Sequence, residues 1–169
     1  TVVLSTITAS KEARPGIDFF RLSIDYEEKM YSIGRIPGSR NRREGKPSDA
    51  AILVSRVIDR PMRPLFPHDL RNDVVIICTA LSVEQDNQPQ LAAMLGASIA
   101  TCISDIPFNG PVAAVAVGLI DGKIVLNPDA AQRAISDMYV TLAGTKEKIC
   151  MIEAEAKQVP DDVMYNALM

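Results

Sequence analysis

Alternating and continuous apolar stretches divide the chain into strand-like and helix-like segments. Val2 to Thr8 is rich in β-branched residues, and Phe19 to Tyr26 alternates apolar with polar positions, so both stretches favour strands. The intervening Arg14-Pro15-Gly16 is typical of a turn, and we expect these two strands to form a hairpin. Val74 to Val83 is almost continuously apolar, which predicts a strand buried on both faces.

Two longer segments have the composition and spacing of helices. Ser48 is typical of a helix N-cap, apolar residues then recur every three or four positions, and Pro61 and Pro64 mark the end of the helix. Leu91 to Ile103 is rich in small apolar residues, which predicts a buried helix in which Met94 fills space in the core. A final helix is expected from Pro160 to Met169.

The other apolar runs favour β-hairpins. Val112 to Leu126 has a strong turn signal at Asp121-Gly122, and a second β pair is expected from Met138 to Ala143 and Ile149 to Glu155. Asp129 to Ile135 between them favours a short helix or a loop. Strands followed by helices, with several hairpins, predict an α+β fold in which a mixed β-sheet packs against helices.

Composition excludes some broad classes of protein. The 169 residues are 47% hydrophobic, which excludes a disordered chain, and no apolar run approaches the roughly 20 residues of a bilayer helix. Cys78, Cys102 and Cys150 lie far apart in apolar stretches, so we expect reduced core thiols in a cytosolic protein. Because the chain begins at Thr1 inside a strand-like run, we interpret it as a fragment of a longer protein.

Charge is distributed unevenly along the chain. The net charge is −3, yet Arg35 to Arg63 alone carries +5 and the rest carries −8. Such a local cationic patch on an acidic body attracts polyanions to one face.

The arginine-rich segment, Arg35 to Lys46, has little apolar character and is expected to be an exposed loop. Arginines on a glycine-flanked segment suit the phosphates of an extended nucleic-acid strand. Further arginines recur at spacings of four and three on the following helix, either as a solvated face with an Asp59 ion pair or as part of one anion site with the loop. The candidate RNA-binding residues are therefore Arg40, Arg42, Arg43, Arg56, Arg60 and Arg63.

Signals for other chemistry are weak. The chain has no glycine-rich phosphate loop and no Ser-His-Asp set. Its one histidine, His68, stands alone beside Pro67 and is expected to be exposed and inert. Glu153 and Glu155 share one side of a strand and in principle suit a metal, but Lys157 follows on that side, which favours a solvated face.

Several motifs occur in a recognisable order, namely Ile36-Pro37-Gly38, Arg42-Arg43-Glu44-Gly45, Ser55-Arg56, Ile58-Asp59-Arg60-Pro61, Arg63-Pro64-Leu65-Phe66-Pro67, Gly96-Ala97-Ser98, Ser104 to Pro111 and Ala143-Gly144-Thr145. Together they resemble the first RNase PH-like core of the bacterial polynucleotide phosphorylase family. The resemblance runs from Thr1 to Met169 without large gaps.

This resemblance implies an α+β RNase PH-like core with the βαβ fold of the ribosomal small-subunit protein domain type. It implies residues 1–158 as the first core, lacking its N-terminal strands, and 159–169 as the start of a helical segment. The family is a homotrimeric cytoplasmic enzyme that degrades single-stranded RNA from its 3′ end by phosphorolysis, using inorganic phosphate and Mg²⁺. Its members also enter RNA-degradation complexes.

The resemblance assigns Arg42 and Arg43 to the loop that grips RNA at the channel entrance. Two phenylalanines usually precede this arginine pair, whereas Arg40 and Asn41 stand here, so the likeness does not extend to the aromatic pair that stacks on bases.

Catalytic positions of active cores are also substituted. Arg133 and Tyr139 stand where the family has two aspartates, Thr141 where it has a lysine, and Gln85 to Gln90 lacks the Gly-Ser phosphate loop. Mg²⁺ requires hard anionic oxygens, so this core is expected to contain no catalytic or metal-binding residues, with Mg²⁺ and phosphate bound outside it.

Three functional interpretations follow from these residues. The preferred one is a non-catalytic core of a phosphorolytic exoribonuclease, which contributes the RNA-gripping loop and the ring scaffold. The alternative is a non-enzymatic RNA-binding or assembly module. An active RNase PH-type subunit is disfavoured by Arg133, Tyr139 and Thr141.

Overall fold

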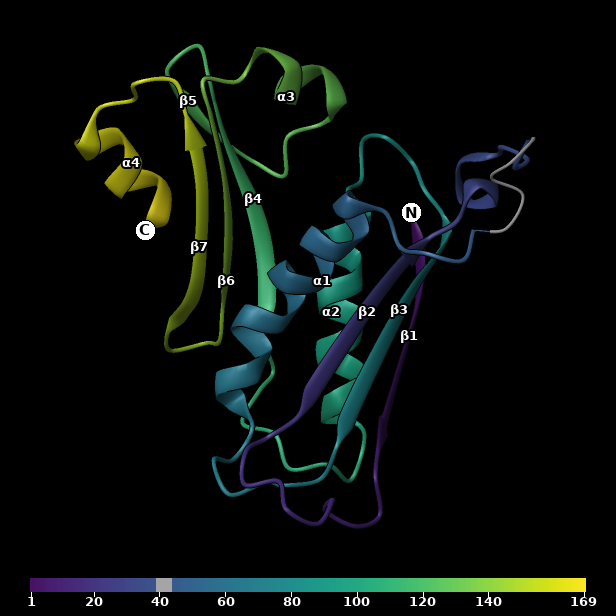
Figure 1. Cartoon of the computed structure of the whole chain (residues 1–169). Helices are drawn as coiled ribbons and strands as arrows, with labels where there is room; N and C mark the ends of the chain where they lie inside the picture. Colours follow the sequence, from purple (N-terminus) through teal and green to yellow (C-terminus); the bar gives the residue numbers. More distant parts are fainter. Residues whose placement is uncertain (39–43) are drawn as a thin grey trace.

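The computed structural model describes residues 1–38 and 44–169 (Figure 1). Its first sheet contains three strands in the order β1 (Val2–Ala9), β3 (Val74–Ser82) and β2 (Leu22–Glu28). The central strand β3 is antiparallel to β1 and parallel to β2. Because a parallel pair needs a crossover, the chain between β2 and β3 forms a helix, which gives a β–α–β unit.

The predicted hairpin between the first two strands is wrong, because β3 lies between β1 and β2. Residues 10–21 connect these two strands, and such a connection is much longer than the two to five residues of a usual hairpin loop. The connection therefore spans the width of a third strand.

The prediction that β3 is buried on both faces is also wrong. Val74, Ile76 and Cys78 are buried, but Ile77 between them is 40% exposed. Helices cover only one face of this sheet, so β3 alternates between buried and accessible positions.

Two helices cover that face. Helix α1 (Asp49–Met62) begins where the Ser48 hydroxyl accepts a hydrogen bond from the Ala51 N–H at 3.1 Å, as predicted, and α2 spans Pro89–Cys102. A Cβ at Gly96 would lie 2.5 Å from the Ser5 hydroxyl oxygen, so glycine permits the close approach of α2 to β1. Short 3-10 helices, η1 (Met30–Ile33) and η3 (Arg63–Leu65), follow β2 and α1.

The second sheet contains both predicted hairpins. Its strand order is β5 (Lys123–Leu126), β4 (Ala113–Ile120), β6 (Met138–Gly144) and β7 (Ile149–Ala156), with all neighbours antiparallel. Asp121 and Gly122 form the β4–β5 turn with φ of 49° and 74°, the backbone that a two-residue turn requires. Helix α3 (Ala130–Ile135) has Asp129 as its N-cap, in a capping box with Gln132.

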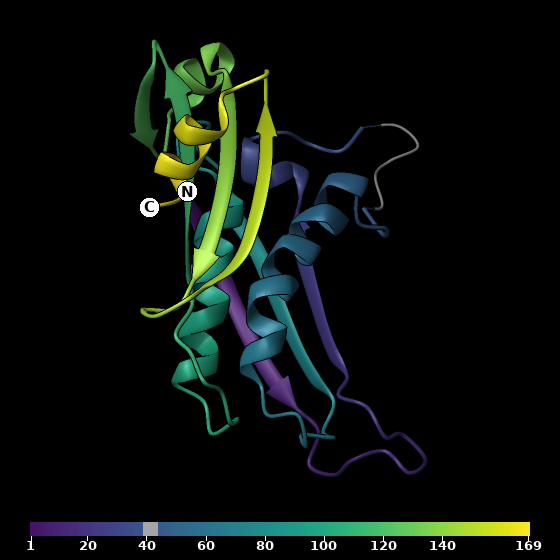
Figure 2. The same ribbon diagram turned by 90° about the vertical axis from the view of Figure 1, so that its left-hand side faces the viewer.

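The elements stack in layers. Helices α1 and α2 lie between the two sheets, and α4 (Asp161–Leu168) lies on the opposite side of the second sheet (Figures 1 and 2). One core cluster joins α1 and α2 to both sheets, including Met94 as predicted. A second cluster joins Ala167 of α4 to β4 and β6.

The predicted α+β class is confirmed, but the cysteine prediction is only partly right. Cys78 is buried in the core, whereas Cys102 is exposed and Cys150 is half-buried. Cys102 is exposed because the outer side of α2, with Leu95 and Ile99, faces solvent. In the part of the chain that the structure describes, no helix is long and apolar enough to cross a membrane.

Candidate functional site

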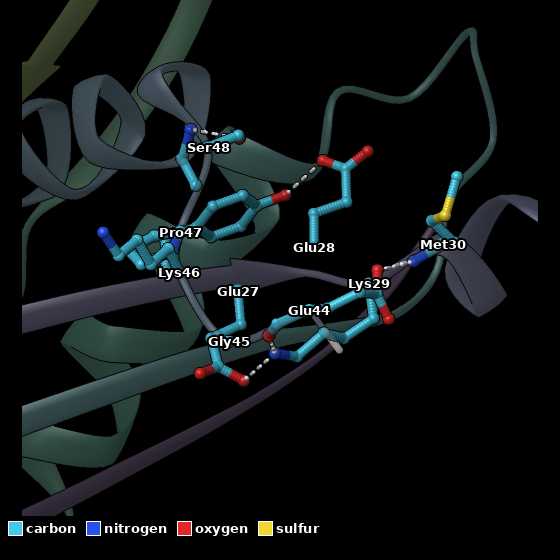
Figure 3. Close-up of a pocket in the computed structure, with 11 residues that line it drawn as sticks. Glu27, Glu28, Lys29, Met30, Glu44, Gly45, Lys46, Pro47 and Ser48 are labelled. Carbon is cyan, nitrogen blue, oxygen red and sulfur yellow. Dashed lines mark hydrogen bonds and ion pairs between the residues drawn. The ribbon is translucent and has the colours of Figure 1, made fainter. Parts of the chain in front are cut away.

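A pocket of about 560 Å³ lies beside Glu44, Gly45 and Lys46, at the C-terminal end of the arginine-rich segment (Figure 3). Its walls come from the end of β2, the start of η1, the start of α1 and the chain just before α1. The lining residues are Tyr26, Glu27, Glu28, Lys29, Met30, Glu44, Gly45, Lys46, Pro47, Ser48 and Ala51. Tyr26 is buried, and its hydroxyl donates to the Glu28 carboxylate at 3.0 Å. Burial, followed by the negative charge of Glu28, strongly raises the pKa of the Tyr26 phenol.

Glu44 attaches the returning end of the segment to this pocket. Its carboxylate Oε1 accepts a hydrogen bond from the Met30 backbone N–H at 2.7 Å, and its carbonyl accepts one from Lys29 Nζ at 3.1 Å. Lys29 also forms an ion pair with Glu27 at 3.6 Å (Figure 3). The departing end lies at the same place, since the Arg35 N–H donates to the Met30 carbonyl at 2.9 Å.

The three loop arginines predicted to bind RNA, Arg40, Arg42 and Arg43, lie outside the described residues. The structure does describe the chain on either side of them, where Arg35 and Lys46 are exposed. The described chain therefore carries one exposed positive charge before residues 39–43 and one after them.

The three predicted arginines of α1 and its exit differ in their surroundings. Arg56 and Arg60 are exposed and make no hydrogen bond or ion pair with the described residues. Arg63 instead pairs with Asp59 at 2.5 Å and donates to the Leu22 carbonyl at 3.1 Å. The Asp59 ion pair suggested by the sequence is therefore present, and it involves Arg63.

Arg63 also lies far from the pocket beside the arginine-rich segment. Ser48 and Ala51 line the pocket at the start of α1, whereas Arg63 follows the end of this 14-residue helix, roughly 20 Å away. Arg63 therefore lies at the opposite end of α1 from this pocket. Arg60 and Arg63 instead line a second pocket, of about 650 Å³, with the exposed His68 at its rim. Its apolar wall includes Phe20 and Phe66, whose ring centroids lie 5.1 Å apart.

Arg133, Tyr139 and Thr141, which the sequence resemblance assigns to the family's catalytic positions, lie in a third region. Tyr139 and Thr141 lie two residues apart on β6, so they share one face, and the Tyr139 hydroxyl hydrogen-bonds the Gln88 side chain. Burial raises the pKa of Tyr139, although the bond with Gln88 opposes this effect. The fold thus brings Tyr139 against Gln88, within Gln85 to Gln90, the segment that lacks a Gly-Ser cluster.

Arg133 binds this segment through backbone carbonyls. Its guanidinium donates to the Pro128 carbonyl at 2.6 Å, the Asp86 carbonyl at 3.3 Å and the Gln85 carbonyl. The Asp86 carboxylate accepts a further hydrogen bond from the Ala130 N–H at 3.1 Å, at the start of α3. We call these contacts of Arg133, Tyr139 and Asp86 the 85–88 clamp.

The 85–88 clamp does not fit Mg²⁺. The two positions that the resemblance assigns to catalytic aspartates hold a guanidinium and a phenol, and the nearby Asp86 carboxylate is already bound to a backbone N–H. Elsewhere in residues 1–38 and 44–169, no group of three or more His, Cys, Asp or Glu side chains gathers as metal ligands. Glu153 and Glu155 are exposed on β7, as expected of a solvated strand face.

Sequence reasoning missed two features of these regions. The bond between Glu44 and Met30 joins residues 14 positions apart, and no local pattern signals it. The carbonyl contacts of Arg133 depend on how Gln85 and Pro128 are folded, so composition alone reveals only the lost carboxylate.

Comparison with known sequences identifies the family. Residues 1–107 match the sequence profile of the 3′ exoribonuclease family, domain 1 (RNase PH), and residues 110–169 match that of domain 2. The chain therefore belongs to the 3′ exoribonuclease family, and the resemblance to RNase PH-like cores is confirmed.

Two relatives of high identity carry the same name. The chain is 65% identical over 168 residues to the polyribonucleotide nucleotidyltransferase of Ruminiclostridium cellulolyticum and 57% identical over 169 residues to that of Clostridioides difficile. These matches cover 99% and 100% of this chain, which spans about a quarter, 24%, of the length of each relative. The crystal structure of rice (Oryza sativa) Rrp46 shares the fold, with a TM-score of 0.74 at 11% identity, over 97% of this chain and 73% of that one.

Proposed function

We propose that this chain is the RNA-gripping, non-catalytic core of a 3′-to-5′ phosphorolytic exoribonuclease that releases nucleoside diphosphates from RNA. The observation that carries the proposal is the 85–88 clamp, in which Arg133 and Tyr139, which the sequence resemblance assigns to the family's acidic positions, bind the chain's own groups. High identity to polyribonucleotide nucleotidyltransferases over the whole chain supports the enzyme class.

Positive charge supports the RNA-binding part of this proposal. Arg40, Arg42 and Arg43 would contact phosphates at the arginine-rich segment, and the exposed Arg56 and Arg60 would contact further phosphates along α1. Arg63 would act near the α1 exit, where its bonds to Asp59 and Leu22 already hold it in place. Phosphate contacts carry no base information, so this grip is independent of RNA sequence.

In the same proposal, catalysis takes place outside this chain. Mg²⁺ and inorganic phosphate would bind a second core outside this chain, because the 85–88 clamp provides no free carboxylate pair. The partners would be single-stranded RNA, two further copies in a homotrimeric ring and an RNA-degradation complex, all in the cytoplasm. Residues 1–158 would form the first core and 159–169 the start of the next helical segment.

An activity comparison tests this division of labour. The 169-residue chain and the full-length protein that contains it are each incubated with single-stranded RNA, phosphate and Mg²⁺, and released nucleoside diphosphates are quantified. We expect release by the full-length protein and none by the chain. Release by the repurified chain that is lost on Tyr139→Phe substitution would place catalysis in this core. RNA binding without release by the full-length protein would favour the non-enzymatic assembly module.

A further inference from the structure

We propose that the pocket beside Phe19, at the C-terminal end of α1, binds one nucleotide of single-stranded RNA. The base stacks on the Phe19 ring, and Arg60 binds the phosphate. The inference rests on the proposed function, because it assumes that the protein binds RNA. It adds a subsite that holds a base, whereas the arginines proposed above contact phosphate alone. We call this cavity the Phe19 pocket.

The Phe19 pocket lies between two segments that are distant in the sequence. Residues 18–20, just before β2, form one wall. Residues between 59 and 71, from the last turn of α1 to the chain after η3, form the other wall. The volume of about 650 Å³ falls within the roughly 300 to 1,000 Å³ of typical small-molecule sites. The cavity is therefore large enough for a single nucleotide.

Aromatic side chains give this pocket an apolar wall. Phe20 packs on the buried Phe66, with ring centroids 5.1 Å apart, and Phe66 packs in turn on Phe108 at 5.0 Å. This cluster anchors the segment that carries Phe19 to the core. Phe19 itself also lines the pocket, yet its side chain is 60% exposed. The ring of Phe19 is therefore accessible to a flat ligand, and the neighbouring cluster holds its backbone in place.

Arginines line the same pocket beside the aromatic wall. Arg60 is exposed, and no hydrogen bond or ion pair between described residues involves its guanidinium. Arg63 pairs with Asp59, which reduces the repulsion between that carboxylate and a bound phosphate. Arg60 is therefore the cation with donors left for a ligand, and a guanidinium binds phosphate through two parallel hydrogen bonds.

The combination of ring and cation favours a nucleotide over other ligands. An aromatic wall alone would suit an apolar side chain of a protein partner, and an arginine alone would suit an inorganic anion. A nucleotide has both a flat base and a charged phosphate. The Asp18 carboxylate, which also lines the pocket, repels a bare anion but accepts a hydrogen bond from the amino group of a base.

Variants of the full-length protein test the role of the ring. Phe19→Ala removes the ring, Phe19→Leu keeps apolar bulk without an aromatic face, and Phe19→Tyr keeps that face. Tyr165→Ala is the matched control, because Tyr165 is 61% exposed and lies on α4, on the opposite side of the second sheet. Arg60→Ala tests the phosphate contact.

Two labelled strands of equal length serve as probes. One is an unstructured oligoribonucleotide, and the other has the same sugar-phosphate backbone without bases. Each protein is titrated with both strands at several salt concentrations. A stacking contact affects only the strand with bases, whereas a phosphate contact affects both strands.

We expect Phe19→Ala and Phe19→Leu to bind the ordinary strand roughly tenfold more weakly, at low and high salt alike, because stacking depends little on salt. Both variants bind the abasic strand as the parent does. Phe19→Tyr and Tyr165→Ala bind both strands as the parent does. Arg60→Ala lowers the magnitude of the slope of log K against log[salt] by about 0.7 on both strands.

Three results would overturn the inference. Unchanged binding of the ordinary strand by Phe19→Ala would show that the ring contacts no base. An equal loss on both strands would assign the effect to something other than stacking. Normal binding by Phe19→Leu would show that the pocket needs apolar bulk, as a site for a protein side chain does. Failure of the proposed function has a different signature, because the parent protein would then bind neither strand.

Discussion

The 85–88 clamp and the outer side of α1 use arginine in opposite ways. Arg133 is half-buried and directs its guanidinium at three backbone carbonyls, so three of its five N–H donors are already taken by the protein. Arg56 and Arg60 are exposed, and the described residues offer them no partner. An arginine surrounded by carbonyls stabilises the fold, whereas one directed at solvent remains available to a ligand.

Arg63 shows an intermediate case. Its side chain pairs with Asp59 and the Leu22 carbonyl, yet it also lines the pocket that Arg60 shares. Position on a cationic helix face is therefore a weaker guide to ligand binding than the number of donors that the protein leaves free.

The largest effect is expected from breaking the 85–88 clamp. In Arg133→Ala, the carbonyls of Gln85, Asp86 and Pro128 lose a charged donor, which should lower the free energy of local opening by about 3 kcal/mol. Hydrogen exchange at residues 85–90 of the full-length protein measures this change. Arg60→Ala is the control, with an expected effect within about 0.5 kcal/mol. Equal protection in the two variants would show that the clamp does not stabilise the segment.

A second prediction adds the aromatic pair that the family usually has. Stacking of a base on an aromatic ring is worth about 2 kcal/mol and depends little on salt, so Arg40→Phe with Asn41→Phe should strengthen RNA binding at high salt. Degradation should also become more processive. Affinity and product lengths at low and high salt check this, and a double variant that binds no tighter at high salt would leave the segment with an electrostatic role only.

Arg60 in the last turn of α1 and Arg63 just after the helix should separate stability from binding. Arg63→Ala should lower the free energy of unfolding by about 1 kcal/mol, because it breaks the Asp59 pair and the bond to Leu22. Arg60→Ala should leave stability unchanged and lower the RNA salt slope by about 0.7. Urea unfolding and RNA titration are run on both variants, and the reverse pattern would contradict the contrast drawn between them.

The smallest expected effect is a change in the free energy of unfolding at alkaline pH. Burial raises the pKa of Tyr139, so the folded state favours its neutral phenol. The stability linked to this group is complete below the ordinary tyrosine pKa of about 10 and is lost as the pH rises from there through the higher pKa of the folded state. Tyr139→Phe should reduce the loss of unfolding free energy between about pH 8 and about pH 11 by less than about 1 kcal/mol. An identical loss in this variant would assign the alkaline effect to Tyr26.

Local signals in the sequence predict most elements but not their partners. The Ser48 cap, the Asp121-Gly122 turn and the paired strands β6 and β7 all follow from residues close together in the chain. The placement of β3 between β1 and β2 depends on contacts about 50 to 80 residues apart, which a turn motif does not encode. The apolar run of β3 likewise does not reveal that helices cover only one face of this strand, because those contacts are also distant in sequence.

The same distinction applies to the functional residues, because their types can be read from the sequence and their contacts cannot. The sequence resemblance implies that Arg133 and Tyr139 replace catalytic carboxylates, because this is a change of residue type. What these residues bind instead is set by the folded positions of Gln85, Gln88 and Pro128. The sequence also does not distinguish Arg56 and Arg60 of α1 from Arg63, which Asp59 and the Leu22 carbonyl hold in place.

The salt dependence of RNA binding tests the central claim most directly. The full-length protein and its Arg42→Ala, Arg43→Ala double variant are titrated with single-stranded RNA over a range of salt concentrations. If each arginine neutralises one phosphate, the magnitude of the slope of log K against log[salt] falls by about 1.4, equally for RNAs of different sequence. An unchanged slope would mean that these arginines are merely solvated and that this core does not grip RNA through them.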